Sequence, residues 1–236
     1  MSETSLLIGD IGGTNARFAL TNHDMEGYHE ERILKCADYE SSESAISAFL
    51  EMTKAPAPTV ICLAAAGPAK EGEVDLTNNH WLLRESSLKK QFDVTHARLL
   101  NDFEAIAYSL PTLTASDLIT VGLKSAHDLS SPNFNVGAIG PGTGLGAAGL
   151  IRRDGYTMPI ITEAGHVGFA PETALQTAVW EVLRHRFGRV SDERLISGKG
   201  VENIYFALAE IYDEPSVHLE AAEIFEQMND NAIATE

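Results

Sequence analysis

Three short segments carry residue types that could bind phosphate and accept a proton. Glycines cluster at residues 9–14 (GDIGGT) and again at 140–146 (GPGTGLG), and between them the pair Asn101-Asp102 directly follows an apolar run. Glycine-rich turns let backbone N–H groups approach an anion closely. A carboxylate can accept the proton of an attacking hydroxyl group. Together the three segments indicate phosphoryl transfer to a hydroxyl.

The first glycine segment is predicted to join two antiparallel strands and to turn its N–H groups toward a phosphate. Asp10 would hold a magnesium ion through water, and the Thr14 hydroxyl would bond to a phosphate oxygen. An ordinary hairpin turn is the simpler alternative, but such a turn requires neither the Asp nor the Thr. The phosphate-binding residues predicted here are Gly9, Asp10, Ile11, Gly12, Gly13 and Thr14.

The second glycine segment offers Gly142, Thr143 and Gly144 as another phosphate clamp. Residues 144–149 also spell G-x-G-x-x-G, but a dinucleotide fingerprint must open a helix, whereas residues 147–155 have the pattern of a strand and hairpin. Residues 197–200 (SGKG) lack the upstream glycine and the final Ser or Thr of a Walker loop. Neither Rossmann nor P-loop chemistry is therefore supported.

Asp102 follows a predicted strand at 97–100 and begins a helical pattern. In isolation, a helix cap is the simplest explanation for such an Asp. Near two phosphate loops, however, a carboxylate at a strand end is well placed to take the proton of a sugar hydroxyl. Such general-base help is typically worth ~10²–10⁴ in rate.

A second group of polar residues could bind a sugar. Glu163 and His166 stand three residues apart around a glycine, an arrangement that can bond to neighbouring hydroxyl groups. A loop with a solvated Glu and a core His would have the same sequence. Asn78 and Glu193 are further candidates for the same task.

The hydrophobic pattern predicts alternating strands and helices that would position these residues. Strands are expected at 5–9, 16–21, 28–35, 59–65, 97–100, 118–121, 134–139 and 147–151. Helices are expected after a cap at Ser42, from Asp102 to Pro111, over 175–183 up to Gly188, over 201–208 and over 219–228. The order strand, glycine turn, strand occurs twice, which indicates two lobes of similar plan, residues 1–111 and 112–236.

Composition limits the partners. The 236 residues include 34 acidic and 17 basic ones, a formal net charge of −17 that opposes binding to nucleic acid. A nucleotide site would then depend on backbone N–H groups and a divalent cation rather than on Lys and Arg. The two cysteines show no CxxC spacing, and no run approaches the ~20 apolar residues of a membrane helix. We expect a cytoplasmic protein with no membrane partner.

The segments together resemble the bacterial glucokinase family of the hexokinase and actin-like superfamily, from Leu6 to about Tyr205. The resemblance implies an α/β, actin-like ATPase (ribonuclease H-like) fold with two lobes, mixed sheets flanked by helices, and a cleft between the lobes. The matching stretches are 9–18 (GDIGGTNARF), 66–68 (AGP), 76–81 (LTNNHW), 100–103 (LNDF), 140–146 (GPGTGLG), 163–170 (EAGHVGFA) and 193–200 (ERLISGKG).

This resemblance implies phosphorylation of glucose at O6 by ATP with Mg²⁺, and we expect a homodimer. It assigns the ATP phosphates to residues 9–14 and the base for the glucose 6-hydroxyl to Asp102. It also implies that the sugar is bound by Asn78, Asn101, Asp102, Glu163, His166 and Glu193. The related repressor, kinase and open-reading-frame group of sugar kinases usually carries a cysteine-rich zinc motif after the matching His, and no such motif follows His166.

Members of the glucokinase family continue beyond the point that matches Glu236, into further helices and a Gly-Gly adenosine-binding loop. We therefore expect a fragment whose uncovered apolar surfaces favour self-association. A non-catalytic glucose-binding remnant is one alternative function. Another is a phosphotransferase of the same fold that acts on mannose, fructose or an acyl phosphate, or that uses polyphosphate as donor.

Overall fold

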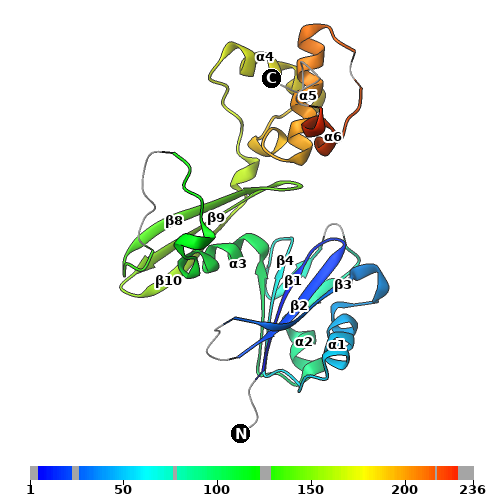
Figure 1. The fold of residues 1–236 in the computed structure, drawn as a ribbon, viewed down its shortest axis with the longest axis vertical. Helices are drawn as coiled ribbons and strands as arrows, with labels where there is room; N and C mark the ends of the chain where they lie inside the picture. The colour runs from blue at the N-terminus through cyan, green and yellow to red at the C-terminus, as the bar shows by residue number, and fades with distance from the viewer. Residues whose placement is uncertain (1–4, 23–26, 77–78, 123–128, 216, 228–236) are drawn as a thin grey trace. The chain divides into compact units, whose positions relative to one another are not determined.

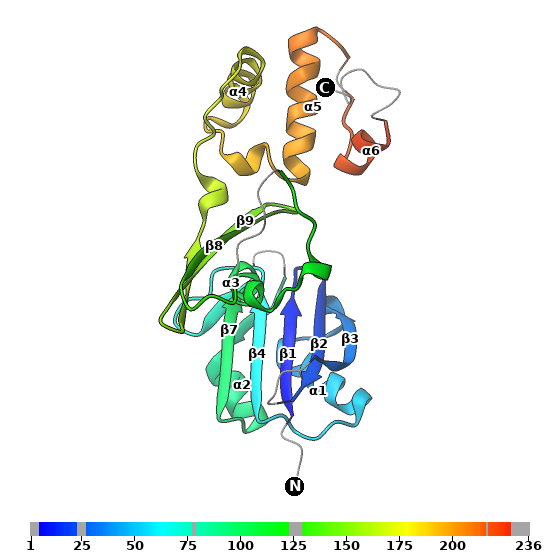
Figure 2. The same cartoon turned by 60° about the vertical axis from the view of Figure 1, so that its left-hand side comes forward.

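A computed structural model describes residues 5–22, 27–76, 79–122, 129–215 and 217–227. The chain divides into two compact units, residues 1–114 and 115–236, each with its own sheet and helices. Figure 1 and Figure 2 show the elements of both units from two directions. Among the described residues, no helix is both long and apolar enough to span a membrane.

The first unit is built on a five-stranded mixed sheet. Its first three strands form an antiparallel meander. The strand at the centre of the sheet also pairs in parallel with the fourth strand, which in turn pairs in parallel with the fifth. In this register Ile11, Ala65 and Asn101 stand side by side, so three parallel strands end at one edge. The strand order is β3 (His29–Lys35), β2 (Asn15–Thr21), β1 (Leu6–Ile11), β4 (Val60–Ala65) and β7 (His96–Asn101).

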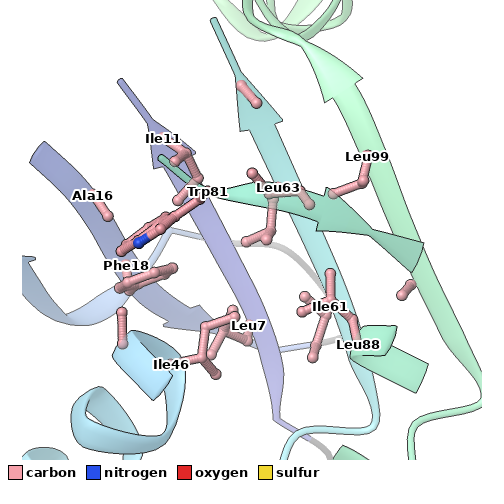
Figure 3. Close-up of a cluster of buried hydrophobic side chains, with 14 of the residues drawn as sticks. Leu7, Ile11, Ala16, Phe18, Ile46, Ile61, Leu63, Trp81, Leu88 and Leu99 are labelled. Atoms are coloured by element: carbon pink, nitrogen blue, oxygen red, sulfur yellow. The ribbon is translucent and has the colours of Figure 1, made fainter. Parts of the chain in front are cut away.

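Side chains that alternate along these strands form the core of the first unit. Leu7 and Ile11 on β1 and Ile61 and Leu63 on β4 are fully buried, as the period of two in a strand predicts. Helices α1 (Ser42–Thr53) and α2 (Glu85–Phe92) contribute Ile46 and Leu88 to the same cluster (Figure 3). This core fixes the strand ends from which the candidate catalytic residues project.

The second unit repeats the meander. It contains an antiparallel sheet in the order β10-β9-β8, and a separate cluster of buried side chains from its helices. The strands are β8 (Phe134–Pro141), β9 (Leu145–Arg153) and β10 (Tyr156–Thr162), and the helices are α4 (Ala174–Phe187), α5 (Gly198–Tyr212) and α6 (Ala221–Glu226). In both units a short glycine turn joins the first two strands of the meander.

Several elements differ from the expectation. Residues 118–121 form no strand, and Ile119 is 92% exposed and Val121 93% exposed. β-Branched residues favour a strand only where the side chains pack against neighbours, which these do not. The last helix is shorter than expected. Helix α2 and a hairpin of β5 (Glu73–Asp75) and β6 (Leu82–Arg84) are additional, and strands of three residues are too short to show a period.

The cap of helix α1 is Ser41, where Ser42 was expected. The Ser41 hydroxyl accepts a hydrogen bond from the Ser44 N–H at 3.2 Å, and the Ser44 hydroxyl lies 3.1 Å from the Ser41 N–H. Ser41→Ala should destabilise the chain by ~0.5–2 kcal/mol, because a backbone donor at the helix start loses its acceptor. Urea unfolding measures this, with Ser47→Ala in the same helix as the control. Equal effects of the two substitutions would contradict the assignment of the cap.

Candidate active site

The first glycine segment divides between a strand and a turn. Residues Gly9, Asp10 and Ile11 belong to β1, so Gly9 is not part of the turn that was expected to start there. A Cβ on Gly9 would lie 2.8 Å from Leu63 Cδ2 and 2.9 Å from Phe18 Cδ1. Gly9 is therefore required for close packing of the core beneath the turn, rather than for the shape of the turn itself.

The turn comprises Gly12, Gly13 and Thr14. The Gly12 N–H donates to Asn15 O at 2.9 Å, and Gly12 O accepts from Asn79 Nδ2 at 3.2 Å. Within the described part of the chain, no residue accepts from the N–H of Gly13 or Thr14. The hydrogen bonds of Gly12 fix the turn, and the other two N–H groups can donate to an anion such as phosphate.

Two carboxylates lie near this edge of the sheet. Asp10 is exposed on β1, and Asp102 is the half-buried first residue of α3 (Asp102–Ser109). Burial raises the pKa of the Asp102 carboxyl, the Phe103 N–H lowers it, and the negative charge of Asp10 raises it. Asp102 is thus a stronger base than an ordinary Asp, and Asp10 is close enough to influence it.

Asn101, not Asp102, caps helix α3. Its Oδ1 accepts from the N–H groups of Phe103 at 3.0 Å and Glu104 at 3.3 Å, and its Nδ2 donates to Gly67 O at 3.1 Å. The simple explanation of Asp102 as the cap is therefore wrong. Asp102 Oδ1 also accepts from the Phe103 N–H, at 2.9 Å, but the helix start does not depend on Asp102 as its cap.

Glu104 completes this helix start, and the sequence interpretation missed it. It is only 2% exposed, and its Oε2 accepts from the Asn101 N–H at 3.4 Å. The spacing Asn-x-x-Glu before an apolar helical stripe is the signature of a capping box and could have identified it. Glu104 fixes the junction between β7 and α3, which presents Asp102.

In the second unit the glycine turn comprises residues 142–144. The Gly142 N–H donates to Gly144 O at 2.8 Å, and Gly142 O accepts from the Gly198 N–H at 2.9 Å. The turn is therefore tied to the beginning of α5. Residues 140, 141, 145 and 146, which were expected in this loop, instead belong to the paired ends of β8 and β9.

Glu193 connects this turn to the sugar-binding candidates. Its Oε2 accepts from the Leu145 N–H at 3.0 Å, and its Oε1 lies 3.6 Å from His166 Nδ1. A Cβ on Gly144 would lie 2.5 Å from Glu193 Oε2, so only glycine allows this approach. One carboxylate thus bridges the first residue of β9, directly after the second glycine turn, and His166.

Three candidates of the second unit line one pocket. Thr143, His166 and Glu193 all line a pocket of about 420 Å³. Glu163 is exposed and precedes the short helix η4 (Ala164–His166), where its carbonyl oxygen accepts from the His166 N–H at 3.0 Å. The backbone of Glu163 therefore orients His166, although its side chain has no described partner.

The candidates fall into two sets, one in each unit. Asp10, Asn101 and Asp102 lie with the first turn, while Glu163, His166 and Glu193 lie with the second. Asn78 lies outside the described residues, next to Asn79, which binds the first turn. No group of three or more His, Cys, Asp or Glu side chains in the described ranges forms a metal cluster.

Comparison with known proteins gives consistent matches over nearly the whole chain. A family model described as Glucokinase matches residues 7–236. The glucokinase of Caulobacter sp. (strain K31) is 41% identical over 224 residues, which are 93% of this chain and 66% of that protein. The chain thus spans about two thirds of the length of that curated relative.

Solved structures show the same fold. A glucokinase from an Antarctic psychrotroph superposes with a TM-score of 0.87 at 33% identity, covering 98% of this chain and 73% of that one. A ROK family glucokinase from Streptomyces griseus, in complex with glucose and AMPPNP, gives a TM-score of 0.56 at 16% identity, covering 98% and 73%. The second match concerns the fold alone. The prediction of an α/β, actin-like ATPase fold is confirmed.

Proposed function

Because this chain belongs to the glucokinase family, we propose that it binds glucose and ATP and transfers the γ-phosphoryl group of ATP to the glucose 6-hydroxyl. The observation that carries the proposal is the double role of Glu193, which accepts from the Leu145 N–H directly after the second glycine turn and approaches His166 Nδ1. A residue with both contacts couples phosphate binding to sugar binding. The complex of the Streptomyces griseus protein with glucose and AMPPNP agrees with these two ligands.

The first unit supplies the base. Asp102 takes the proton of the glucose 6-hydroxyl as the bond from O6 to phosphorus forms and the bond from phosphorus to the ADP oxygen breaks. The raised pKa of Asp102 strengthens it for this task. The N–H groups of Gly13 and Thr14 donate to phosphate oxygens, which stabilises the charge that develops during transfer.

The carboxylate of Asp10 fits a magnesium ion that is bound mainly by ATP. Mg²⁺ is usually held by one or two carboxylates together with substrate phosphates and water, and Asp10 is exposed on β1 beside the first turn. Bound there, the ion would neutralise phosphate charge. Its charge would also oppose the effect of Asp10 on Asp102.

The second unit holds the substrates in place. Glu193, His166 and Glu163 bind glucose hydroxyl groups, and Thr143 with the neighbouring turn residues binds phosphate oxygens. Asn78 and Asn101 are proposed to contribute to the sugar site from the first unit. The amide of Asn101 already bonds to α3 and Gly67, so we assign it mainly a positioning role.

Titration of the chain with glucose and with Mg-ATP separately, followed by a coupled phosphorylation assay, tests this function. Glucose phosphorylation supports the proposal. Binding of glucose without Mg-ATP binding or turnover would instead indicate a non-catalytic glucose-binding protein. Assays with mannose, fructose, acetate and polyphosphate distinguish other phosphotransferases of the same fold.

We also propose that the chain forms a homodimer, because Tyr156, Met158 and Ile160 on strand β10 are exposed. Light scattering measures the mass of the assembly.

Glu193→Gln should weaken glucose binding by ~10–100-fold, since a hydrogen bond to a charged group contributes ~1.5–3 kcal/mol. The amide keeps the size of the side chain but loses its charge. Calorimetry with glucose measures the dissociation constant. Asp192→Asn is the matched control, because the Asp192 side chain makes no described contact with the turn. An unchanged glucose affinity in Glu193→Gln would contradict the role of Glu193.

A further inference from the structure

The first glycine turn is bonded to two parts of the chain that the sequence does not place beside it. Gly12 O accepts from Asn79 Nδ2 at 3.2 Å, a residue 67 positions further along the chain, and from Cys36 Sγ at 3.8 Å. The Cys36 N–H donates to Thr14 O at 2.9 Å. Two carbonyl groups of the turn are therefore held by residues outside it.

The bond from Asn79 fixes the direction of one N–H group. A trans peptide unit is planar, and its C=O and N–H groups point to opposite sides. Gly12 O and the Gly13 N–H belong to the same peptide unit, so Asn79 on one side of the turn directs the Gly13 N–H to the other side. In the described ranges no residue accepts from this N–H group, which is proposed above to donate to a phosphate oxygen.

The side-chain amide of Asn79 uses both of its ends. Its Oδ1 accepts from the Trp81 N–H at 3.2 Å, while its Nδ2 donates to Gly12 O. Because the Gly12 oxygen can only accept and the Trp81 N–H can only donate, the amide satisfies both partners in one orientation and neither when it is turned over. Neither a carboxylate nor an aliphatic side chain can replace it in both bonds.

The segment that carries Asn79 is anchored in the core. Trp81 is 2% exposed and belongs to the same buried cluster as Ile11, the residue before Gly12 (Figure 3). The indole Nε1 of Trp81 also donates to Tyr39 O at 3.1 Å. Because the core fixes the position of Trp81, Asn79 holds Gly12 O in place rather than following the turn when it moves.

We propose that Asn79 is a positioning residue for phosphoryl transfer, which holds Gly12 O so that the Gly13 N–H is directed at a phosphate oxygen of ATP. The inference rests on the proposed function, which gives this N–H group its ligand. A donor that is oriented before the ligand arrives needs no reorganisation when charge develops on the phosphate. Asn79 should therefore affect the binding of Mg-ATP and leave the binding of glucose nearly unchanged.

Three substitutions at residue 79 separate the two bonds of the amide. Asn79→Ala removes both bonds, and Asn79→Asp keeps the acceptor for the Trp81 N–H. Asn79→His keeps a donor, because the Nδ1 of a His occupies the same place in the side chain as the Nδ2 of an Asn. Thermal unfolding accompanies all three variants, because loss of the bond to the Trp81 N–H also lowers stability.

Calorimetry of the whole chain with Mg-ATP measures the effect on binding. Asn79→Ala and Asn79→Asp should weaken the affinity by ~3–10-fold, as expected for loss of one hydrogen bond, and Asn79→His should weaken it much less. Asn79→Ala and Asn79→His both lose the bond to the Trp81 N–H, so a purely structural role of residue 79 would affect both alike. Asn22→Ala is the matched control, since Asn22 is exposed and follows the opposite end of β2.

A second measurement follows the turn itself and needs no ligand. The amide signal of Gly13 in a proton–nitrogen NMR spectrum should shift in Asn79→Ala and return toward its original position in Asn79→His. Asn22→Ala should leave this signal in place. If Asn79→Ala does not fold, the Gly13 signals of Asn79→Asp and Asn79→His decide the outcome.

The inference and the proposed function fail in different ways. If the unaltered chain binds no Mg-ATP, the proposed function fails, and the Gly13 signal still decides whether Asn79 orients the turn. An unchanged Gly13 signal in Asn79→Ala overturns the inference. So do equal Mg-ATP affinities in Asn79→Ala, Asn79→His and Asn22→Ala, because the donor to Gly12 O would then have no effect.

Discussion

Asp102→Asn should lower kcat for glucose phosphorylation by ~10²–10⁴-fold and leave the dissociation constant for glucose nearly unchanged. The amide keeps the size of the carboxyl group but cannot take the proton of the 6-hydroxyl. Steady-state assays and glucose calorimetry measure the two constants. Asp38→Asn, at an exposed position in the same unit, is the control. Near-normal turnover in Asp102→Asn would remove Asp102 as the base.

The raised pKa of Asp102 also predicts how activity depends on pH. Transfer needs the ionised carboxylate, so the rate should fall on the acid side at a pH above the ordinary Asp value of 3.8. Because the charge of Asp10 contributes to the rise, Asp10→Asn should lower the pKa of Asp102. Carbon-detected NMR of the Asp102 carboxyl follows this shift without requiring activity. An unchanged pKa in Asp10→Asn would contradict the coupling.

The same shift has a consequence for stability. A carboxyl whose pKa is higher in the folded chain binds its proton more readily there, so the folded state loses stability as pH rises from 3.8 through the raised pKa. At neutral pH, Asp102→Asn removes the loss of stability that comes from ionising this carboxyl in the folded chain. The variant should therefore melt at a slightly higher temperature than the unaltered chain at pH 7, and the difference should disappear near pH 3.

Local patterns were sufficient to predict many of the elements that carry the site, but not strand β10 or the short helices that contain His166 and Glu193. The turn between β1 and β2 follows from apolar runs around adjacent glycines, and α4 ends at Gly188, whose φ of 77° favours glycine. The helix caps are Ser41 and Asn101, and in each case the predicted cap was the next residue along the chain. Neighbouring Ser, Asn and Asp residues satisfy the same preference for a cap. Only the hydrogen bonds of the folded chain distinguish between such neighbours.

Contacts between distant residues could not be predicted from the sequence alone. The bond between Leu145 N–H and Glu193 joins residues 48 positions apart, and no periodicity reports it. Gly9 was predicted to shape a turn, whereas its role depends on Leu63 and Phe18 packing against it. Arg189, Arg194 and Lys199 line one pocket of the second unit, which net charge could not predict, since net charge averages over the surface and a local cluster depends on the fold.

Gly165→Ala is expected to have the second large effect, on the stability of the second unit. A Cβ on Gly165 would overlap the carbonyl oxygen of Leu145, a backbone atom that cannot move without disturbing β9. Forcing an extra carbon into a packed site typically costs ~1–3 kcal/mol. Thermal and urea unfolding should show this loss, and glucose affinity should fall because residue 165 adjoins His166.

Gly168→Ala supplies a control with the same chemical change only three residues away. No heavy atom lies within 4 Å of the position that its Cβ would occupy, so this variant should unfold like the unaltered chain. Because both substitutions add one methyl group to the same segment, the difference between them isolates the contact with Leu145. Equal stability and equal glucose affinity in the two variants would mean that the segment around His166 is not held against β9. A loss confined to Gly165→Ala would support the proposal that this contact positions the sugar-binding side chains.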